Sequence, residues 1–330
     1  MMEEIERILK ERGKLIEKEL EKSIPRKGIT NLNDAVWYHL DSGGKRIRPV
    51  LAILTCEALG GDAKKVMPFA AACELFHNWC LVHDDIMDGD TIRRDKEAVW
   101  KKFGLAHGIN IGDFMSEKVY ELIAGLGKRG GDEKTIIMLV KEMAETAVKT
   151  AEGQTMDMNL RGNNKPSEKD YMKMIEFKTA WYLTLPMVGG AIVAGRTDLV
   201  PKIKEFGMKV GPAFQIADDL LDLTEGKGRG ETGSDIKEGK RSIIVVHCAS
   251  KCSESERKRM FEILDKPREK TSREDIEFVK QLFDKYGSLD YARNKAKALA
   301  EESRKIASSL PQDLRKILDG FAQYLIERKK

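Results

Sequence analysis

The feature that most constrains the fold is a helical repeat of apolar residues that runs through nearly the whole 330-residue chain. Near the start, Ile5, Ile8 and Leu9 recur at intervals of three and four residues, and the same interval returns in almost every later segment. Apolar residues at this spacing form one face of an α-helix. Strand signals are nearly absent, and the only β-branched cluster, Ile243 to Val246, fits a buried helical turn as well as a short strand. The sequence therefore predicts an all-α protein.

Proline and glycine divide this pattern into about a dozen helices. Three helix ends are predicted from such residues, at Pro25 with Gly28, at Gly60-Gly61 and at Gly130-Gly131. Ser167, with Asp170 three residues later, favours a capping box, and Pro311 fits the start of the last helix. No segment resembles a linker and no repeat has a fixed period, so we expect a single domain over residues 1–330.

Charge and composition argue against several classes of protein. Charged residues make up 34 % and hydrophobic residues 41 % of the chain, as in ordinary globular proteins. The 58 Lys and Arg residues nearly balance the 54 Asp and Glu residues, which leaves a net charge of +4 and disfavours nucleic acid as a partner. The five cysteines contain no C-x-x-C pair, which favours reduced, buried thiols and a cytoplasmic location.

Membrane insertion is not expected either. The N-terminus is a charged amphipathic segment without the apolar core of a signal peptide. The longest uncharged run, Thr179 to Gly195, is shorter than the ~20 apolar residues of a membrane span and contains Pro186. We interpret it as a helix buried in the core.

Two copies of the pattern D-D-x-x-D are the main candidates for a functional site, at Asp84 to Asp88 and at Asp218 to Asp222. Carboxylates four residues apart lie on one face of a helix and repel each other unless a cation lies between them. Oxygen ligands without His or Cys favour Mg²⁺, which commonly shares its coordination shell with substrate phosphates. A single copy fits a solvated acidic face equally well, but both copies lie in otherwise apolar helices. We therefore expect all these carboxylates to face one cavity, where divalent ions clamp a diphosphate.

Basic residues could form the complementary half of such a site. The segment Gly43 to Pro49 places Lys45, Arg46 and Arg48 at the predicted start of a helix, where N–H groups favour anions. The alternative is a cationic cap exposed to water. Arg93-Arg94 follows the first aspartate motif and can reach anions held there.

A glycine-rich loop, Gly226 to Gly239, precedes Lys240 and is suited to closing over phosphates. Residues 228–233 match G-x-G-x-x-G, but no strand precedes them, so a dinucleotide site is rejected. His77 and His83 flank the approach to Asp84, and such histidines are more often satisfied core residues than ligands. The absence of H-E-x-x-H argues against a zinc site.

Taken in order, these segments resemble the trans-isoprenyl (polyprenyl) diphosphate synthase family over about 200 residues. The matching motifs are G-G-K-R-x-R-P at 43–49, H-D-D-x-x-D at 83–88, R-R at 93–94, G-Q at 153–154, K-T at 178–179, F-Q-x-x-D-D-x-x-D at 214–222 and G-S-D-I-x-E-G-K at 233–240. The combination is specific, whereas any single motif is not. The resemblance implies an all-α bundle around a deep central cavity, usually homodimeric, with the aspartate motifs on opposite sides of its mouth.

The resemblance also implies a role for each matching residue. Asp84, Asp88 and Asp218 would bind roughly two to three Mg²⁺ ions that hold the allylic diphosphate. The same diphosphate would contact Arg93, Lys178 and Lys240. The isopentenyl diphosphate site would comprise Lys45, Arg48, His77 and Arg94, while Thr179 and Gln215 would face the developing carbocation.

Two positions depart from the family pattern. Where relatives have R-R-G-x-P followed by His, this chain has Arg93-Arg94-Asp95-Lys96-Glu97 and then Trp100, so this loop could differ. Relatives often carry a lysine about ten residues before Lys240, where this chain has Gly230 beside Arg229.

Product length would depend on residues one to two helical turns before Asp84, namely Phe76, Trp79 and Cys80. One turn is about 5.4 Å, close to the length of one isoprene unit. A small Cys80, a bulky Trp79 and an uninterrupted Asp84 to Asp88 resemble the archaeal geranylgeranyl type, which makes C20 from dimethylallyl, geranyl or farnesyl diphosphate. Trp79 could instead merely pack between helices.

Other functions fit less well. A farnesyl (C15) or bifunctional C15/C20 synthase is the nearest alternative. A class I terpene cyclase would need Ser or Thr at position 222 and Glu at 226, where this chain has Asp and Gly. An HD-type phosphohydrolase would use His83-Asp84 and leave Asp218 unexplained, and a non-catalytic helical subunit would not need both motifs.

Overall fold

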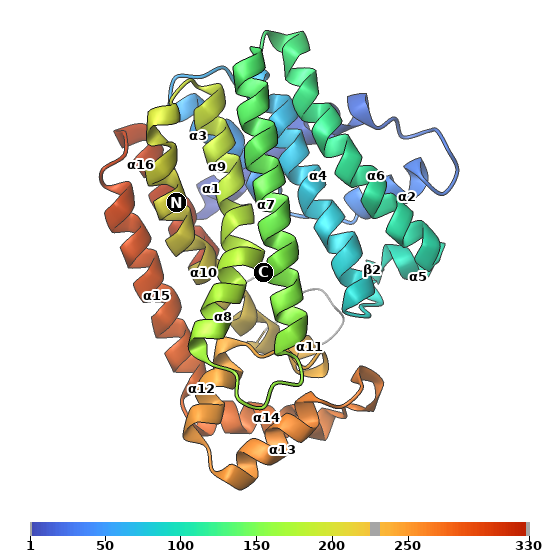
Figure 1. Cartoon of the computed structure of the whole chain (residues 1–330), viewed down its shortest axis with the longest axis vertical. Helices are drawn as coiled ribbons and strands as arrows, with labels where there is room; N and C mark the ends of the chain where they lie inside the picture. The colour runs from blue at the N-terminus through green and yellow to red at the C-terminus, as the bar shows by residue number, and fades with distance from the viewer. Residues whose placement is uncertain (1, 225–231, 328–330) are drawn as a thin grey trace. The chain divides into compact units, whose positions relative to one another are not determined.

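The computed structural model describes residues 2–224 and 232–327, and helices dominate this part of the chain (Figure 1). The α-helices are α1 (Met2–Ser23), α2 (Asn33–Leu40), α3 (Ile47–Ala58), α4 (Ala63–Met87), α5 (Val99–Phe103), α6 (Leu105–Ala124), α7 (Glu133–Leu160), α8 (Glu168–Ile175), α9 (Trp181–Val193), α10 (Val200–Thr224), α11 (Ser234–Lys237), α12 (Ile243–Lys251), α13 (Glu254–Leu264), α14 (Arg273–Lys285), α15 (Ser288–Ala307) and α16 (Gln312–Glu327). The shorter elements are the 3-10 turns η1 (Gly125–Arg129), η3 (Thr197–Leu199) and η4 (Arg268–Lys270), the π-helical segment η2 (Glu176–Ala180), and the antiparallel strands β1 (Ile92–Arg93) and β2 (Lys96–Glu97).

The predicted all-α class is confirmed, and the ambiguous cluster Ile243 to Val246 forms the first turn of α12. Helix ends lie where the proline and glycine residues predict them: α1 ends before Pro25, α3 ends before Gly60-Gly61, and Pro311 directly precedes α16. Ser167 and Asp170 form the expected capping box at the start of α8. The run Thr179 to Gly195 is helical as far as Val193 and largely buried, as predicted. None of the helices in the described ranges has the length and apolar character needed to cross a membrane.

The chain divides into two compact units, each assembled from segments far apart in sequence. Unit 1 comprises Met1–Glu145, Leu183–Lys204 and Ala307–Phe321, and unit 2 comprises Thr146–Tyr182, Glu205–Ile306 and Ala322–Lys330. Neither unit is a continuous half of the chain. The single domain over residues 1–330 stays a prediction.

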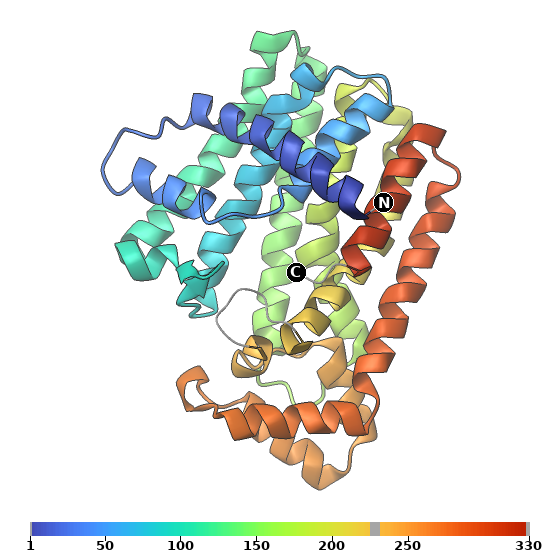
Figure 2. The same ribbon diagram turned by 180° about the vertical axis from the view of Figure 1, so that it is seen from behind.

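Unit 1 is built around α4, which packs along α6 (Figure 1), while α1 lies across α3 and α4 (Figure 2). The carboxyl-terminal half of α9 needs glycine, because a Cβ atom on Gly189 would lie 1.9 Å from Cε1 of the buried Phe69 in α4. A Cβ atom on Gly190 would lie 2.6 Å from the carbonyl oxygen of Ala52 in α3. The two adjacent glycines therefore let α9 approach both helices, and α4 holds the first aspartate motif in a closely packed setting.

Unit 2 has its own apolar core, to which α10, α12 and α14 contribute buried residues such as Ile216, Ile244 and Phe283. Serine caps begin several of its helices. Ser253 and Ser272 form capping boxes at the starts of α13 and α14. Each such cap satisfies N–H groups that have no partner within the helix. This core supports α10, which carries the second aspartate motif.

Candidate active site

The first aspartate motif lies at the carboxyl end of α4. Asp88 is the residue that caps the helix, and its N–H donates to the carbonyl oxygen of Asp84 over 2.8 Å. Both side chains are half-buried, and their spacing places them on one face. The carboxyl end of a helix carries partial negative charge, so two acids here destabilise each other and the helix end unless a cation compensates them. Their position therefore suits a hard divalent ion.

Asp85 has a different environment from its two neighbours in the motif. It is fully buried and accepts hydrogen bonds from Arg93, with a distance of 2.7 Å to Nε. Arg93 also donates to Asp90 over 3.2 Å, so one buried guanidinium in β1 lies against two buried carboxylates. This ion-paired group fixes the β1–β2 hairpin beneath the motif. The prediction that every carboxylate of the motif faces a cavity is wrong for Asp85. Its negative charge is neutralised inside the protein by Arg93.

Arg94 binds the loop that precedes α3, whereas Arg93 binds the acids Asp85 and Asp90. Arg94 has a left-handed backbone with φ of 52°, and its Nη1 donates to the carbonyl oxygen of Gly43 and, over 3.4 Å, to Ser42 Oγ. A Cβ atom on Gly44 would lie 2.9 Å from Arg94 Nη2. Glycine at this position thus lets the hairpin dock on the loop that precedes α3.

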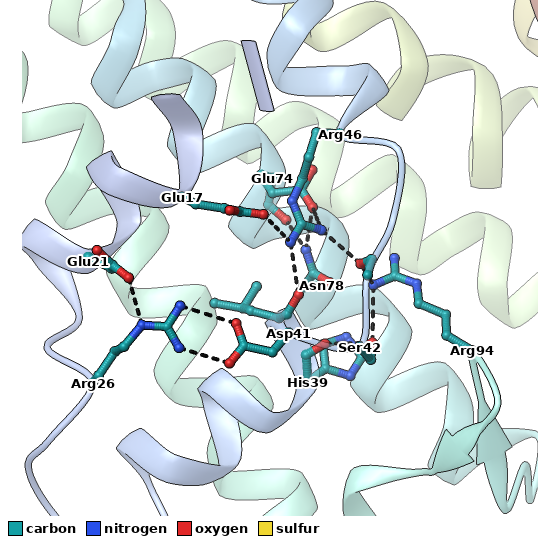
Figure 3. A network of polar contacts seen from close by, with 12 residues as sticks. Glu17, Glu21, Arg26, His39, Asp41, Ser42, Arg46, Glu74, Asn78 and Arg94 are labelled. Atoms are coloured by element: carbon teal, nitrogen blue, oxygen red, sulfur yellow. Dashed lines mark hydrogen bonds and ion pairs between the residues drawn. The ribbon is translucent and has the colours of Figure 1, made fainter. Parts of the chain in front are cut away.

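Arg46 organises that loop from inside (Figure 3). Its guanidinium pairs with Glu74 of α4 at 3.0 Å and with Glu17 of α1 at 3.4 Å, and it also donates to the carbonyl oxygens of Leu40 and Gly43. Arg46 is 6 % exposed and Arg48 is 9 % exposed. The alternative of a cationic cap exposed to water is therefore wrong for these two arginines, because both are buried.

Three residues predicted for isopentenyl diphosphate share one electrostatic environment in unit 1. Burial lowers the pKa of His77 well below its usual range, and the nearby charges of Arg48 and Arg94 lower this pKa further. The pKa of the buried His39 is lowered for the same reasons, burial first and then Arg94 and Arg93. Both imidazoles are therefore neutral at pH 7 beside several cations. Lys45, also predicted for this site, is half-buried in the same loop.

In unit 2, the second aspartate motif shows the same division of roles. Asp218 is half-buried on α10, whereas Asp219 and Asp222 are buried. Asp222 accepts from Ser234 Oγ at 2.5 Å and from the N–H of Asp235 at 3.0 Å, which ties α10 to α11. The expectation that all three acids face a cavity is wrong for Asp222, which is buried against protein groups. Asp219 also binds protein groups, but it lines a small pocket together with Asp235 and Lys240.

Asp219 ends a chain of hydrogen bonds that includes both residues predicted to face a carbocation. It accepts from the hydroxyl of Tyr171 at 2.7 Å and from Nε2 of Gln215 at 2.9 Å. The amide oxygen of Gln215 accepts from the Thr179 hydroxyl at 2.7 Å. Burial, followed by the charge of Asp219, raises the pKa of Tyr171 well above its usual value, so its hydroxyl remains a donor. Because the carboxylate of Asp219 can only accept hydrogen bonds, it determines the orientation of the Gln215 amide and, through that amide, of the Thr179 hydroxyl.

The two predicted lysines of unit 2 are both held by acids. Lys178 lies 2.6 Å from Asp157, and Lys240 lies 3.0 Å from Asp235 and 2.6 Å from Glu238. Burial raises the pKa of Asp157, but the charges of Lys178 and Lys240 outweigh this and leave that pKa below its ordinary value. Lys178 and Lys240 therefore lie close enough to act on the same carboxylate.

The π-helical segment η2 places Lys178 and Thr179 next to each other at a bulge. A Cβ atom on Gly153 of α7 would lie 2.2 Å from the backbone nitrogen of Lys178, and one on Gly211 of α10 would lie 2.4 Å from Ala180 Cα. Two glycines therefore let helices approach the bulge from both sides. π-bulges of this kind occur frequently at functional sites.

Three acids with evident roles were missed in the sequence: Asp157, which binds Lys178; Glu74, which binds Arg46; and Asp90, which binds Arg93. Asp157 follows the G-Q pair at 153–154 by three residues, and this spacing on one helix was the available signal.

Of the residues predicted for chain length, Phe76 is buried with its ring centroid 5.3 Å from that of Trp79, and Cys80 is half-buried. In the described ranges, no group of three or more His, Cys, Asp or Glu side chains forms a metal site. The glycine-rich loop from Gly226, with Arg229 and Gly230, lies partly outside the described residues.

Comparison with known proteins assigns the family. A profile of the polyprenyl synthetase family matches residues 29–283. The geranylgeranyl pyrophosphate synthase of Geoglobus acetivorans is 35 % identical over 98 % of this chain and 99 % of its own length. A short chain isoprenyl diphosphate synthase of Methanothermobacter thermautotrophicus is 34 % identical over 99 % of this chain and 100 % of its own length. The crystal structure of geranylgeranyl pyrophosphate synthetase from Pyrococcus horikoshii aligns with a TM-score of 0.88 and 32 % identity, covering 99 % of both chains. The chain therefore belongs to the polyprenyl synthetase family.

Proposed function

We propose that this protein is a prenyl transferase that condenses isopentenyl diphosphate with the allylic dimethylallyl, geranyl and farnesyl diphosphates. One observation carries the proposal beyond family membership. Unit 1 holds an acid pair, Asp84 and Asp88, together with the buried Arg48 and the half-buried Arg94 and neutral His77. Acids that suit a metal ion and cations that suit a second anion are the requirements for binding two diphosphates.

The donor groups fit Mg²⁺. Asp84, Asp88 and Asp218 offer only oxygen and are half-buried, whereas Asp85, Asp219 and Asp222 are buried. They would hold roughly two to three ions, which when bound neutralise negative charge on the leaving pyrophosphate. Oxygen donors without nitrogen or sulfur disfavour zinc.

The basic residues would bind and orient the two substrates. Lys45, Arg48, His77 and Arg94 would hold isopentenyl diphosphate, with His77 in its neutral form donating a hydrogen bond. Arg93, Lys178 and Lys240 would contact the allylic diphosphate. Because Asp157 and Glu238 already hold the two lysines, these side chains lose little rotational freedom when the anion binds.

Thr179 and Gln215 would stabilise the allylic cation that forms when the C–O bond breaks. The hydroxyl of Thr179 donates its only proton to Gln215, so the oxygen can present only lone pairs to other groups. The orientation of the Thr179 hydroxyl depends on Asp219. Because Asp219 accepts a hydrogen bond from the amide nitrogen of Gln215, the amide oxygen of Gln215 faces Thr179. Isopentenyl diphosphate then attacks the cation, and the adduct loses a proton to pyrophosphate.

We propose C20 as the main product, with Trp79 as the floor that stops elongation. The named relatives support this length, since the Geoglobus and Pyrococcus proteins are geranylgeranyl synthases. A C15 or bifunctional C15/C20 enzyme is the alternative. We further propose a cytoplasmic homodimer, consistent with five cysteines that form no disulfide and with the family resemblance. Light scattering after size exclusion would measure the oligomer.

The test is incubation with labelled isopentenyl diphosphate, one allylic primer and Mg²⁺, followed by chromatography of the dephosphorylated products. We expect Mg²⁺-dependent products that end at C20. No elongation with any of the three primers would refute the activity, and a product that stops at C15 would refute only the chain length.

A further inference from the structure

Trp79 is held in place by a hydrogen bond through its indole nitrogen. It lies on α4, five residues before Asp84, and its Nε1 donates to Nδ1 of His83 over 3.1 Å. The two rings meet edge to face, with centroids 6.3 Å apart and an interplanar angle of 77°. Phe76 contacts Trp79 from the preceding turn. The indole is thus held between a ring above and a ring below on the same helix.

The bond to Trp79 determines which nitrogen of His83 carries a proton. An indole N–H is only a donor, so Nδ1 of His83 must accept and the proton must be on Nε2. Nε2 lies 3.2 Å from the carbonyl oxygen of Ile109 in α6 and can donate to it. It also lies 3.7 Å from a carboxylate oxygen of Asp113. His83 therefore links the indole of Trp79 on α4 to the backbone of α6.

Helix α6 has room for His83 because residue 112 is glycine. A Cβ atom on Gly112 would lie 2.1 Å from Nε2 and 2.4 Å from Cδ2 of His83. Any other residue at 112 would displace the imidazole from its present position. Gly112 thus belongs to the same arrangement as His83 and Trp79.

We propose that His83 is a positioning residue that sets product length by holding the Trp79 indole in one orientation. Gly112 leaves the space that the imidazole of His83 occupies against α6. This inference rests on the proposed function, in which Trp79 is the floor of the elongation site. Without the bond from Nε1, the indole can rotate about its side-chain torsions, and the space available to the growing chain increases. His83 itself need not contact substrate.

The test compares the product distributions of His83→Phe, Trp79→Phe and the double variant, with His107→Phe, an exposed histidine of α6, as the matched control. Phenylalanine at 83 keeps a ring but removes both nitrogen atoms, and phenylalanine at 79 removes the donor. We expect His83→Phe to raise the ratio of products longer than C20 to C20 about fivefold, the factor for one ordinary hydrogen bond. In the Trp79→Phe background the same change at 83 should have no further effect. His83→Asn should restore much of the original ratio, because its Oδ1 can accept from Trp79.

A second variant tests the same link from the other helix. Gly112→Ala should lengthen the products as His83→Phe does, whereas Gly125→Ala, where a Cβ atom meets nothing within 4 Å, should not. This comparison leaves the chemical identity of the residue next to Asp84 unchanged, and the Mg²⁺ dependence of turnover in both variants separates an effect on metal binding from a shift in the product ratio. Thermal unfolding of each variant identifies a merely structural defect, which would lower stability without changing that ratio.

The inference would be overturned if the products are unchanged in both His83→Phe and Gly112→Ala while Trp79→Ala lengthens them. An equal shift for His83→Phe in the Trp79→Phe background would also overturn it. So would failure of a folded, active His83→Asn variant to restore the product ratio. If Trp79→Ala itself leaves the product length unchanged, the proposed floor is refuted together with the role of His83. Activity in that variant would still support the prenyl transferase assignment.

Discussion

At the scale of single residues, the acids of the two motifs differ in what surrounds them. Asp85, Asp219 and Asp222 are buried against donors of the protein, while Asp84, Asp88 and Asp218 are half-buried. A buried carboxylate with hydrogen-bonded partners stabilises local structure. The half-buried acids remain partly accessible, as ligands shared with a bound ion and its waters must be.

Replacing Asp84 by alanine should therefore slow turnover about a thousandfold, since loss of ~4 kcal/mol of transition-state stabilisation corresponds to that factor. Steady-state kinetics with farnesyl and isopentenyl diphosphates in saturating Mg²⁺ would measure the change. Asp198→Ala is the matched control, because Asp198 is exposed and forms an ion pair with Arg196 in unit 1. Near-normal turnover of Asp84→Ala would contradict the metal assignment.

His39 gives a second prediction at this scale, on the pH dependence of stability. Its pKa in the folded protein is lowered, so below about pH 6.5 the unfolded chain binds a proton that the folded chain does not. The free energy of unfolding should then fall as the pH falls, by at most about 1.4 kcal/mol per unit for this one group. Urea unfolding between pH 7.5 and 5.5 would measure the slope.

His39→Gln should flatten this acid-side slope, whereas His107→Gln, at an exposed position, should leave it unchanged. Equal slopes in the wild-type protein and His39→Gln would show that His39 is not the neutral buried group inferred here. Because the sign follows from a lowered pKa, stabilisation on acidification would contradict it as well.

The sequence predicted which residues make up the candidate site better than it predicted their contacts. Motif spacing alone identified Asp84, Asp88 and Asp218 as candidates. The partners of Asp85 and Asp219, by contrast, are Arg93 and Tyr171, which lie 8 and 48 residues away in the chain. Spacing on one helix cannot reveal such contacts. The spacing from the G-Q pair could have marked Asp157 as a candidate, but not its pairing with Lys178, which lies 21 residues away.

At the scale of elements, close approach of helices is as important as the side chains they carry. Gly153 of α7 lies directly against the backbone of Lys178 in the π-helical segment. The glycine of the G-Q motif is therefore required for the close packing of α7 against η2, which the sequence alone did not indicate. An added methyl group here must push α7 away from η2, together with Asp157 on α7 and Lys178 on η2.

Gly153→Ala should thus cost about 1–3 kcal/mol of stability, the usual range for overpacking, and should lower kcat by displacing Lys178. Chemical denaturation and steady-state kinetics would measure the two effects. Gly125→Ala places the same methyl group where nothing lies within 4 Å and should change neither quantity. A Gly153→Ala variant with wild-type stability would mean that α7 can shift without cost.

Helices were predicted well because their apolar spacing and their capping residues are local signals. The β1–β2 hairpin was not predicted, since its strands are two residues long and its turn depends on positive φ angles at Arg94 and Asp95. These angles are unfavourable for residues other than glycine. They persist here with Arg93 ion-paired on one side and Arg94 bonded to Gly43 on the other.

At the scale of the whole molecule, the candidate residues are distributed over two compact units. Unit 1 contributes Asp84, Asp88 and the arginine and histidine group, and unit 2 contributes Asp218 with Lys178 and Lys240. If both groups bind the same metal diphosphate, each must contribute to its affinity. A ligand that binds only the folded chain raises the free energy of unfolding in proportion to that affinity.

Mg²⁺ together with inorganic pyrophosphate should therefore raise the Tm more than the sum of the shifts from each alone. At a ligand concentration 100 times Kd the expected stabilisation is about 2.7 kcal/mol. Asp84→Ala and Asp218→Ala should each remove most of this shift, while Asp198→Ala should retain it, and EDTA should abolish it in every variant. Differential scanning calorimetry would measure all four proteins under the same conditions. A full shift in Asp218→Ala would exclude that residue from the metal site, and an equal shift from pyrophosphate without Mg²⁺ would mean that the lysines and arginines, rather than the acids, dominate binding of the anion.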